Sequence, residues 1–214
     1  LLYRDILTLL RDTDEAALAR LGAYGRETIL EHYSVSRMTQ DYIDAYERLL
    51  MEKKLLNDVV ISGYYGFKNN GDDALLSAII EDLKEQIPEV KICVLSYRPY
   101  ETQAIYGVEA VNRFNLPYIA RAMKGAKLLV SGGGSLIQDG TSTQSLIYYL
   151  HIMRMAKKRG LRSMLYANGI GPLVHRANIR RARHALDALD LITLRDPASW
   201  DELEKIGLDR SRAI

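Results

Sequence analysis

Three consecutive glycines, Gly132, Gly133 and Gly134, are the residues best suited to binding a ligand, and they follow the apolar run KLLVS. Glycine has no Cβ and accepts positive φ, so backbone N–H groups in this loop can turn toward one point. Together with Ser135, they can hold an anion or a sugar hydroxyl. A tight connection from a strand to a helix needs only one glycine, so three in succession favour close approach of a ligand.

Two more apolar runs lead into glycine-bearing loops. The run ending at Ser62 enters GYYGFKNNGDDA, residues 63–74, and the run MLYAN enters GIGP, residues 169–172. Parallel strands end at one edge of a sheet, so we expect the three loops to form one site. We assign substrate-binding roles to Gly63, Tyr64, Tyr65, Asn70, Gly71, Gly132, Gly133, Gly134, Ser135, Gln138, Gly169 and Gly171.

Two carboxylates are candidates for catalysis. Asp72 follows the first glycine-bearing loop and Asp139 follows the triple glycine. A carboxylate at the mouth of a cleft can bind sugar hydroxyls or take a proton from an acceptor hydroxyl. A structural alternative stays open for the first loop, since Asn70 or Asp72 would also cap a helix, whose positive end suits Asp72 and Asp73.

Arg195 is the third candidate catalytic residue, because it ends the last apolar run in TLRDPAS. A guanidinium group there can grip a carboxylate or phosphate through two hydrogen bonds. The alternative is a structural ion pair with Asp196. The histidines lie on predicted helices without the spacing of a metal site, and none is assigned to catalysis: His32, His151, His175 and His184.

The elements that must position these residues change in kind along the chain. Residues 1–54 show apolar residues at helical spacing and no strand signal, with Ser34 placed to cap a second helix. From residue 57 to 214, short β-branched runs alternate with amphipathic helices. That alternation predicts an α/β fold, a doubly wound parallel Rossmann-like sheet of about six strands, preceded by a helical appendage.

Composition narrows the function classes. The chain has 214 residues, a net charge of +2 and interspersed acids and bases, which argues against nucleic acid as a partner. The spacing of Gly63, Gly66 and Gly71 does not match the dinucleotide fingerprint, so no nicotinamide cofactor is expected. We expect the single cysteine, Cys93, to be a buried residue with an apolar packing role. Without a signal peptide or an apolar run of about 20 residues, we expect a cytoplasmic protein whose membrane contact is peripheral, at the inner face.

The motifs GYYGFKNNGDDA, SGGGSLIQD, YYL, YANGIGP and TLRDPAS occur in an order that resembles the N-terminal half of a polysaccharide pyruvyl transferase. The resemblance covers residues 58–214. It implies one half of a GT-B-like architecture, and transfer of a ketal pyruvate from phosphoenolpyruvate to a sugar of a lipid-linked cell-wall precursor. It implies no metal and no cofactor beyond that donor. Asp72-Asp73 departs from the Asp-Glu that this family usually shows, which puts an acid/base role for Asp73 in doubt.

The resemblance also implies a second Rossmann-like half that this chain lacks, so the chain alone is expected to be inactive. It begins with Leu1 and stops after a helix where another strand is expected, which suggests an excerpt of a longer polypeptide. The opening helices resemble the closing helices of a retaining GT-B glycosyltransferase. Two other functions stay open: a nucleotide-sugar-dependent GT-B glycosyltransferase and a non-catalytic glycan-binding module.

Overall fold

The computed structural model describes residues 14–32, 34–35, 37–39, 42, 58–140, 142–209, 211 and 213. The chain divides into two compact units, residues 1–46 and 47–214. In the first, helix α2 spans Glu15–His32. Ser34 Oγ accepts a hydrogen bond from the Arg37 backbone N–H at 3.2 Å, as expected of a helix cap. Most of the second predicted helix lies outside the described residues.

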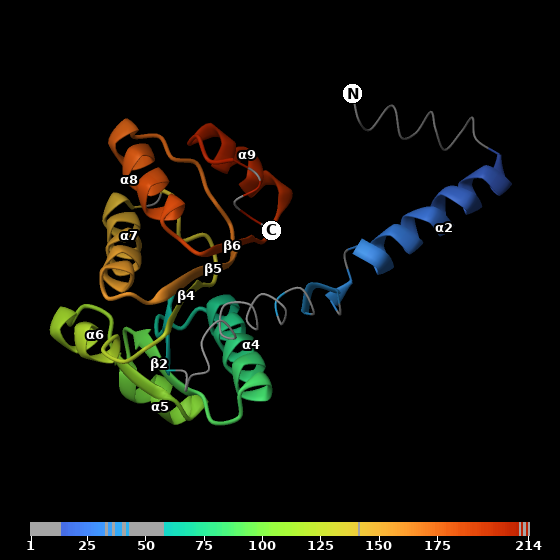
Figure 1. Ribbon diagram of the computed structural model, residues 1–214. Coiled ribbons are helices and arrows are strands. Elements are labelled where there is room, and N and C mark those ends of the chain that lie inside the picture. Colours follow the sequence, from blue (N-terminus) through green and yellow to red (C-terminus); the bar gives the residue numbers. More distant parts are fainter. Residues whose placement is uncertain are drawn as a thin grey trace. The chain divides into compact units, whose positions relative to one another are not determined.

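A six-stranded parallel sheet forms the second unit, which confirms the predicted fold class (Figure 1). The strands are β1 (Asp58–Ser62), β2 (Lys91–Ser96), β3 (Glu109–Asn112), β4 (Leu128–Gly132), β5 (Arg162–Asn168) and β6 (Leu191–Leu194). Their order is β3-β2-β1-β4-β5-β6. The chain changes direction across the sheet between β1 and β4, and ligands of such sheets bind beyond the strand ends at this point.

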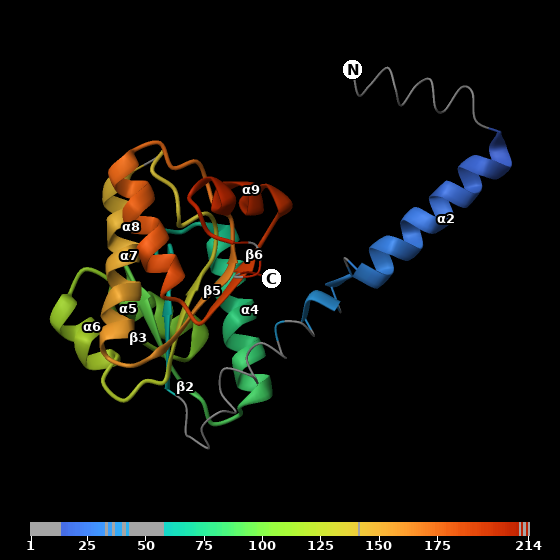
Figure 2. The same ribbon diagram turned by 45° about the horizontal axis from the view of Figure 1, so that its top comes forward.

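Helices cover both faces of this sheet. They are α4 (Asn70–Gln86), α5 (Pro99–Tyr106), α6 (Leu116–Ala122), α7 (Thr143–Lys158), α8 (Arg176–Asp187) and α9 (Pro197–Lys205). Figures 1 and 2 show α7 and α8 on one side of the sheet and α4 on the other. With both faces covered, the central strands must be apolar along their length, which accounts for the uninterrupted runs VVI in β1 and LLV in β4.

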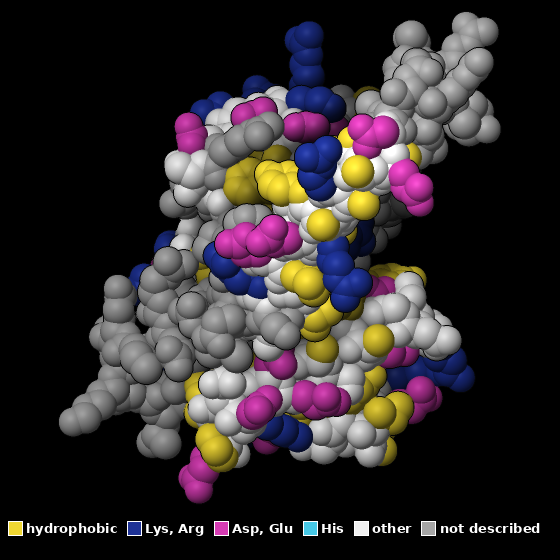
Figure 3. Space-filling view, turned by 90° about the vertical axis from the view of Figure 1, so that its right-hand side faces the viewer, with side chains coloured by type: hydrophobic (Ala, Val, Ile, Leu, Met, Phe, Trp, Pro, Cys, Tyr) yellow, Lys and Arg dark blue, Asp and Glu magenta, His cyan; other side chains and the backbone are white. Residues whose placement is uncertain are grey.

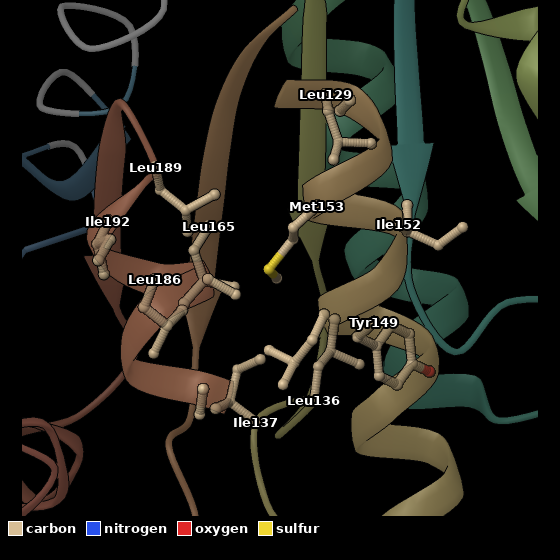
Figure 4. Packing of buried hydrophobic residues seen from close by; sticks show 14 of the residues in the cluster. Leu129, Leu136, Ile137, Tyr149, Ile152, Met153, Leu165, Leu186, Leu189 and Ile192 are labelled. Carbon is tan, nitrogen blue, oxygen red and sulfur yellow. The ribbon is translucent and has the colours of Figure 1, made fainter. Parts of the chain in front are cut away.

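A hydrophobic core lies between the sheet and the helices α6, α7 and α8, and it extends to Leu203 of α9. Figure 4 shows Leu129, Leu165 and Ile192 of three neighbouring strands facing Met153 of α7 and Leu186 of α8. Complete burial of one such side chain contributes about 1.5–3 kcal/mol. This packing fixes the strand ends from which the candidate loops emerge.

Helix caps set where these loops end. Asn69 caps α4, because its Oδ1 accepts a hydrogen bond from the Gly71 N–H at 3.1 Å. The expectation that Asn70 or Asp72 caps this helix is therefore wrong, since the cap lies one residue before Asn70 and three before Asp72. Asp196 caps α9 by accepting the Ser199 N–H at 2.9 Å.

Charges of both signs are interspersed on the face shown in Figure 3, in line with the small net charge. Over the described part of the chain, no helix combines the length and the apolar character needed to cross a bilayer.

Candidate functional site

The loops after β4 and β5 are joined backbone to backbone. The Gly169 N–H donates to the Gly134 carbonyl at 3.0 Å, and the Gly171 N–H donates to the Ile137 carbonyl at 3.0 Å. A parallel bridge pairs Ile137 with Ile170. These bonds continue the sheet beyond its regular strands, so the second and third predicted loops form one surface.

The loop after β1 lies against the same surface. The Tyr65 hydroxyl donates to the Gly132 carbonyl at 2.9 Å. A Cβ added at Gly63 would overlap both that carbonyl oxygen and the Tyr65 ring. Tyr65 is completely buried, and burial together with the nearby Asp72 raises its pKa well above the ordinary value. Gly63 and Tyr65 therefore hold the first loop against the triple glycine.

The triple glycine faces Asp72 directly. Gly133 and Gly134 have φ of 90° and 57°, which residues with side chains rarely adopt. A Cβ at Gly134 would lie 3.0 Å from Asp72 Oδ1, and one at Gly133 would lie 3.3 Å from the same atom. The glycines are thus required both for the backbone path and for the space that the carboxylate occupies.

Asp72 is a largely buried carboxylate in the first turn of α4, where the positive end of the helix favours its charge. Its side chain is 7% exposed and accepts no hydrogen bond from the described residues. Burial, assisted by the charge of Asp73, raises its pKa. A buried acid costs stability unless its charge is satisfied, so this placement favours a role in binding or catalysis.

Asp139 is surrounded by donors instead. Its carboxylate accepts the N–H groups of Val174 at 2.8 Å and His175 at 3.1 Å, and Asn178 Nδ2 at 2.9 Å. Burial alone would raise the pKa of Asp139, but these hydrogen bonds outweigh it and the pKa lies well below its usual value. The arrangement clasps the start of α8 to the end of the triple-glycine loop.

Arg195 reaches the same surface from β6. Its Nη2 lies 3.4 Å from Ser135 Oγ, and its Nε lies 3.1 Å from Asp196 Oδ2. The ion pair considered from the sequence is therefore present, while half of the side chain stays exposed. A Cβ at Gly169 would lie 2.6 Å from Arg195 Nη2, so this glycine makes room for the guanidinium group.

The other assigned residues divide into two groups. Gln138 lies within the joined loops. Its Nε2 donates to the Ser135 carbonyl at 3.1 Å, and a Cβ added at Gly171 would lie 2.7 Å from the Cβ of Gln138. Tyr64, Asn70 and Gly71 are exposed at the rim, and no described contact joins them to the triple glycine.

His175 was not assigned from the sequence, yet its Nδ1 lies 2.9 Å from Asp139 Oδ2. Its side chain is 66% exposed, so Asp139 orients an imidazole whose other nitrogen faces outward. The two residues are 36 positions apart in the chain. Only the meeting of the loops after β4 and β5 could have revealed this pair.

Arg113 was also missed. It follows β3, it is buried, and its Nη1 donates to the Gly63 carbonyl at 2.9 Å. Its guanidinium carbon lies 4.3 Å from the centre of the Tyr148 ring and 5.3 Å from that of Tyr149. The position of an arginine directly after a predicted strand was a usable signal.

The described residues contain no group of three or more His, Cys, Asp or Glu side chains arranged to hold a metal ion. The charged and polar groups that the chain brings to this edge are Asp72, the Asp139–His175 pair, Arg195 and the backbone N–H groups.

Comparisons with known proteins place the chain in a family. A model of the family described as polysaccharide pyruvyl transferase matches residues 69–214. A search of curated proteins gave no match. The match does not include the opening helices, whose resemblance to a glycosyltransferase stays a prediction.

Two solved structures are similar in their fold. One, titled UDP-N-acetylglucosamine 2-epimerase, has 12% identity and a TM-score of 0.48, with 75% of this chain and 47% of that chain covered. The other, titled a Rossmann-fold NAD(P)-binding family protein from Shigella flexneri, has 15% identity and a TM-score of 0.43, covering 65% of this chain and 67% of that chain. The chain spans about half the length of the first. By the family match over residues 69–214, it belongs to the polysaccharide pyruvyl transferase family.

Proposed function

We propose that this chain forms one wall of a cleft in which pyruvate is transferred from phosphoenolpyruvate to two hydroxyl groups of a sugar, giving a ketal. The sugar belongs to a polysaccharide precursor. The proposal includes a second Rossmann-like half that closes the cleft, and a cytoplasmic setting with at most peripheral contact with the membrane.

Asp72 is the observation that supports this proposal most. Its carboxylate is buried, lies against the Gly133–Gly134 backbone and accepts no hydrogen bond from the described residues. Burial raises its pKa, which makes its ionised form a better proton acceptor. A hydroxyl placed beside the glycines would supply the missing donor, so Asp72 is the base that we assign to the acceptor.

The reaction balances with two hydroxyl groups and one donor molecule. The methylene carbon of phosphoenolpyruvate gains a proton and becomes a methyl group. The two sugar oxygens each form a bond to the neighbouring carbon, and the bond from that carbon to the phosphate oxygen breaks. The sugar loses two protons, of which one replaces the proton used at the methylene and the other leaves with phosphate or solvent.

The remaining groups have roles that follow from their charge. Arg195 and the N–H groups of the triple glycine suit the carboxylate or phosphate of the donor. His175, oriented by Asp139, is exposed and can carry a proton toward the cleft. Because its oxygens accept hydrogen bonds from the protein itself, we assign Asp139 to positioning His175.

The test compares Asp72→Asn with Asp73→Asn, a neighbouring carboxylate on the same helix. Phosphate release from phosphoenolpyruvate, and the ketal methyl signal by NMR, are measured on the longest polypeptide that carries this chain. We expect Asp72→Asn to lower turnover at least 100-fold, a loss typical of removing a general base. Asp73→Asn should stay within a few-fold of the unchanged protein.

The pH profile gives a second readout. A base must be ionised, so turnover should fall on the acid side, with a midpoint above the ordinary pKa of an aspartate because burial raises the pKa of Asp72. Turnover of Asp72→Asn equal to that of the unchanged protein would remove Asp72 from the mechanism. Consumption of a nucleotide-sugar in place of phosphoenolpyruvate would overturn the proposed function.

A further inference from the structure

A row of aromatic side chains lies beside the candidate site, formed by Tyr64, Phe67, Tyr97 and Phe114. Tyr64 stacks on Phe67 with ring centres 4.1 Å apart, and Phe67 stacks on Tyr97 at 4.7 Å. Tyr97 meets Phe114 edge to face at 6.2 Å. Tyr64, Tyr97 and Phe114 are 40%, 45% and 61% exposed, so the row presents aromatic surface to solvent.

Arg113 makes cation–π contacts with two rings of this aromatic row. Its guanidinium carbon lies 5.2 Å from the centre of the Phe67 ring and 5.5 Å from that of Phe114. It forms no ion pair with a carboxylate among the described residues, so its partners are the Gly63 carbonyl, these two rings and the rings of Tyr148 and Tyr149. Stacking and cation–π contacts fix the rings before any ligand arrives, which lowers the entropy cost of binding.

A cavity of about 620 Å³ opens next to Tyr97, at the carboxyl ends of β2 and β3. It shares the sheet edge of the candidate site. Three tyrosines and three amides line much of it: Tyr97, Tyr100, Tyr118, Gln103, Asn112 and Asn115. Its volume falls within the range of about 300–1,000 Å³ that is usual for ligand sites.

The charges in the lining cancel. Arg98 Nη1 lies 3.3 Å from Glu101 Oε1, and both residues line the cavity. What remains is aromatic surface, phenolic hydroxyls and amide groups. The Oδ1 atoms of Asn112 and Asn115 accept the N–H groups of Phe114 and Tyr118, so these two amides offer NH₂ donors, while Gln103 can both donate and accept. This combination suits an uncharged ring that has apolar C–H faces and many hydroxyls, which describes a neutral pyranose.

We propose that the aromatic row and the adjoining cavity bind a neutral pyranose segment of the acceptor glycan, away from the hydroxyls that react at Asp72. This inference rests on the proposed function, because it extends the acceptor across the sheet edge from β1 and β4 toward β3. It makes the chain selective for an acceptor of several sugars over a single sugar.

The test measures sugar binding by the protein directly. Three neutral tetrasaccharides, chitotetraose, cellotetraose and maltotetraose, are titrated by NMR next to their monosaccharides. Tyr100→Ala and Tyr118→Ala are compared with Tyr24→Ala, a tyrosine of α2 that is 71% exposed. Tyr100 and Tyr118 are 86% and 57% exposed, so their truncation leaves the core intact.

We expect at least one tetrasaccharide to bind more tightly than its monosaccharide. Each of Tyr100→Ala and Tyr118→Ala should weaken that binding about fivefold to tenfold, as the loss of an aromatic contact implies. Tyr24→Ala should leave it unchanged. Absence of binding by all three tetrasaccharides, or equal affinity in all variants, would overturn the inference.

Sugar binding and phosphate release from phosphoenolpyruvate are both measured on the longest polypeptide that carries this chain, and the pair of readouts separates the two proposals. Sugar binding that depends on the tyrosines, without phosphate release, would contradict the proposed function and support the sugar site. Phosphate release that is equal in all variants, without sugar binding that depends on the tyrosines, would support the proposed function and contradict the sugar site. Self-association that Tyr100→Ala abolishes, without any effect on sugars, would assign this surface to a protein partner and reject the sugar site.

Discussion

Asparagine in place of Asp139 tests whether this carboxylate is a structural clasp or a contact for the ligand. The change keeps the size and shape of the side chain but removes its charge and turns one oxygen into an NH₂ donor. In the folded protein, the backbone N–H groups of Val174 and His175 and the amide of Asn178 all point at this carboxylate. At least one of these donors would then face another donor.

The expected loss follows from these contacts. A hydrogen bond to a charged group contributes about 1.5–3 kcal/mol, and a buried donor left without a partner costs about 1–3 kcal/mol. We therefore expect Asp139→Asn to lower the free energy of unfolding by about 2–4 kcal/mol. With a urea m-value of about 2 kcal/mol per M, the midpoint of unfolding should fall by about 1–2 M.

Trp200 is the only tryptophan of the chain and lies in α9, so its fluorescence reports unfolding of the second unit. Glu89→Gln is the matched control, because Glu89 is an exposed carboxylate with no hydrogen bond to the described residues. Its midpoint should shift by less than the equivalent of about 0.5 kcal/mol.

The pH dependence has a defined sign. The pKa of Asp139 lies below its ordinary value in the folded protein, so the carboxylate stabilises the fold above its unfolded pKa of about 3.9. The difference between the unchanged protein and Asp139→Asn should be constant from neutral pH to about pH 5 and shrink as the pH falls through 3.9. If Asp139→Asn keeps its urea midpoint but loses turnover, the structural role of Asp139 is wrong and a contact with the ligand is supported.

Two other substitutions test the joined loops. Tyr65→Phe removes the donor to a buried carbonyl and should lower the free energy of unfolding by about 1–2 kcal/mol, measured by urea titration; an unchanged midpoint would show that this bond does not hold the first loop. Gly169→Ala places a Cβ against Arg195 and should lower turnover about tenfold, the effect of displacing one charged contact by about 1.4 kcal/mol. Gly140→Ala, where a Cβ meets nothing within 4 Å, is its control, and equal turnover in the two alanine variants would contradict the role given to Gly169.

The sequence was sufficient for the fold because its signals are local and repeated. The runs VVI in β1 and LLV in β4 fit strands covered on both faces, and the helices between them are amphipathic. The glycines that directly follow Ser62, Ser131 and Asn168 placed the three loops correctly, because parallel strands end at one edge of the sheet.

Side-chain partners at the site could not be predicted in the same way. Asp72 and Asp139 look alike in the sequence, since each follows a glycine-bearing loop. They differ only in which donors the fold brings to them, and those of Asp139 come from residues about 35 positions later. His175 was missed for the same reason, because its partner Asp139 lies in another loop, whereas the position of Arg113 directly after a predicted strand was a signal that could have been used.

The burial of the Asp72 carboxylate has a consequence for engineering. A neutral side chain at this position would relieve the desolvation of a buried acid without giving up any hydrogen bond that the described residues make to it. Laboratory selection for heat resistance alone would therefore enrich clones that have replaced this aspartate. Under the proposed mechanism such clones would lose turnover, so selection for stability must be coupled to a screen for product.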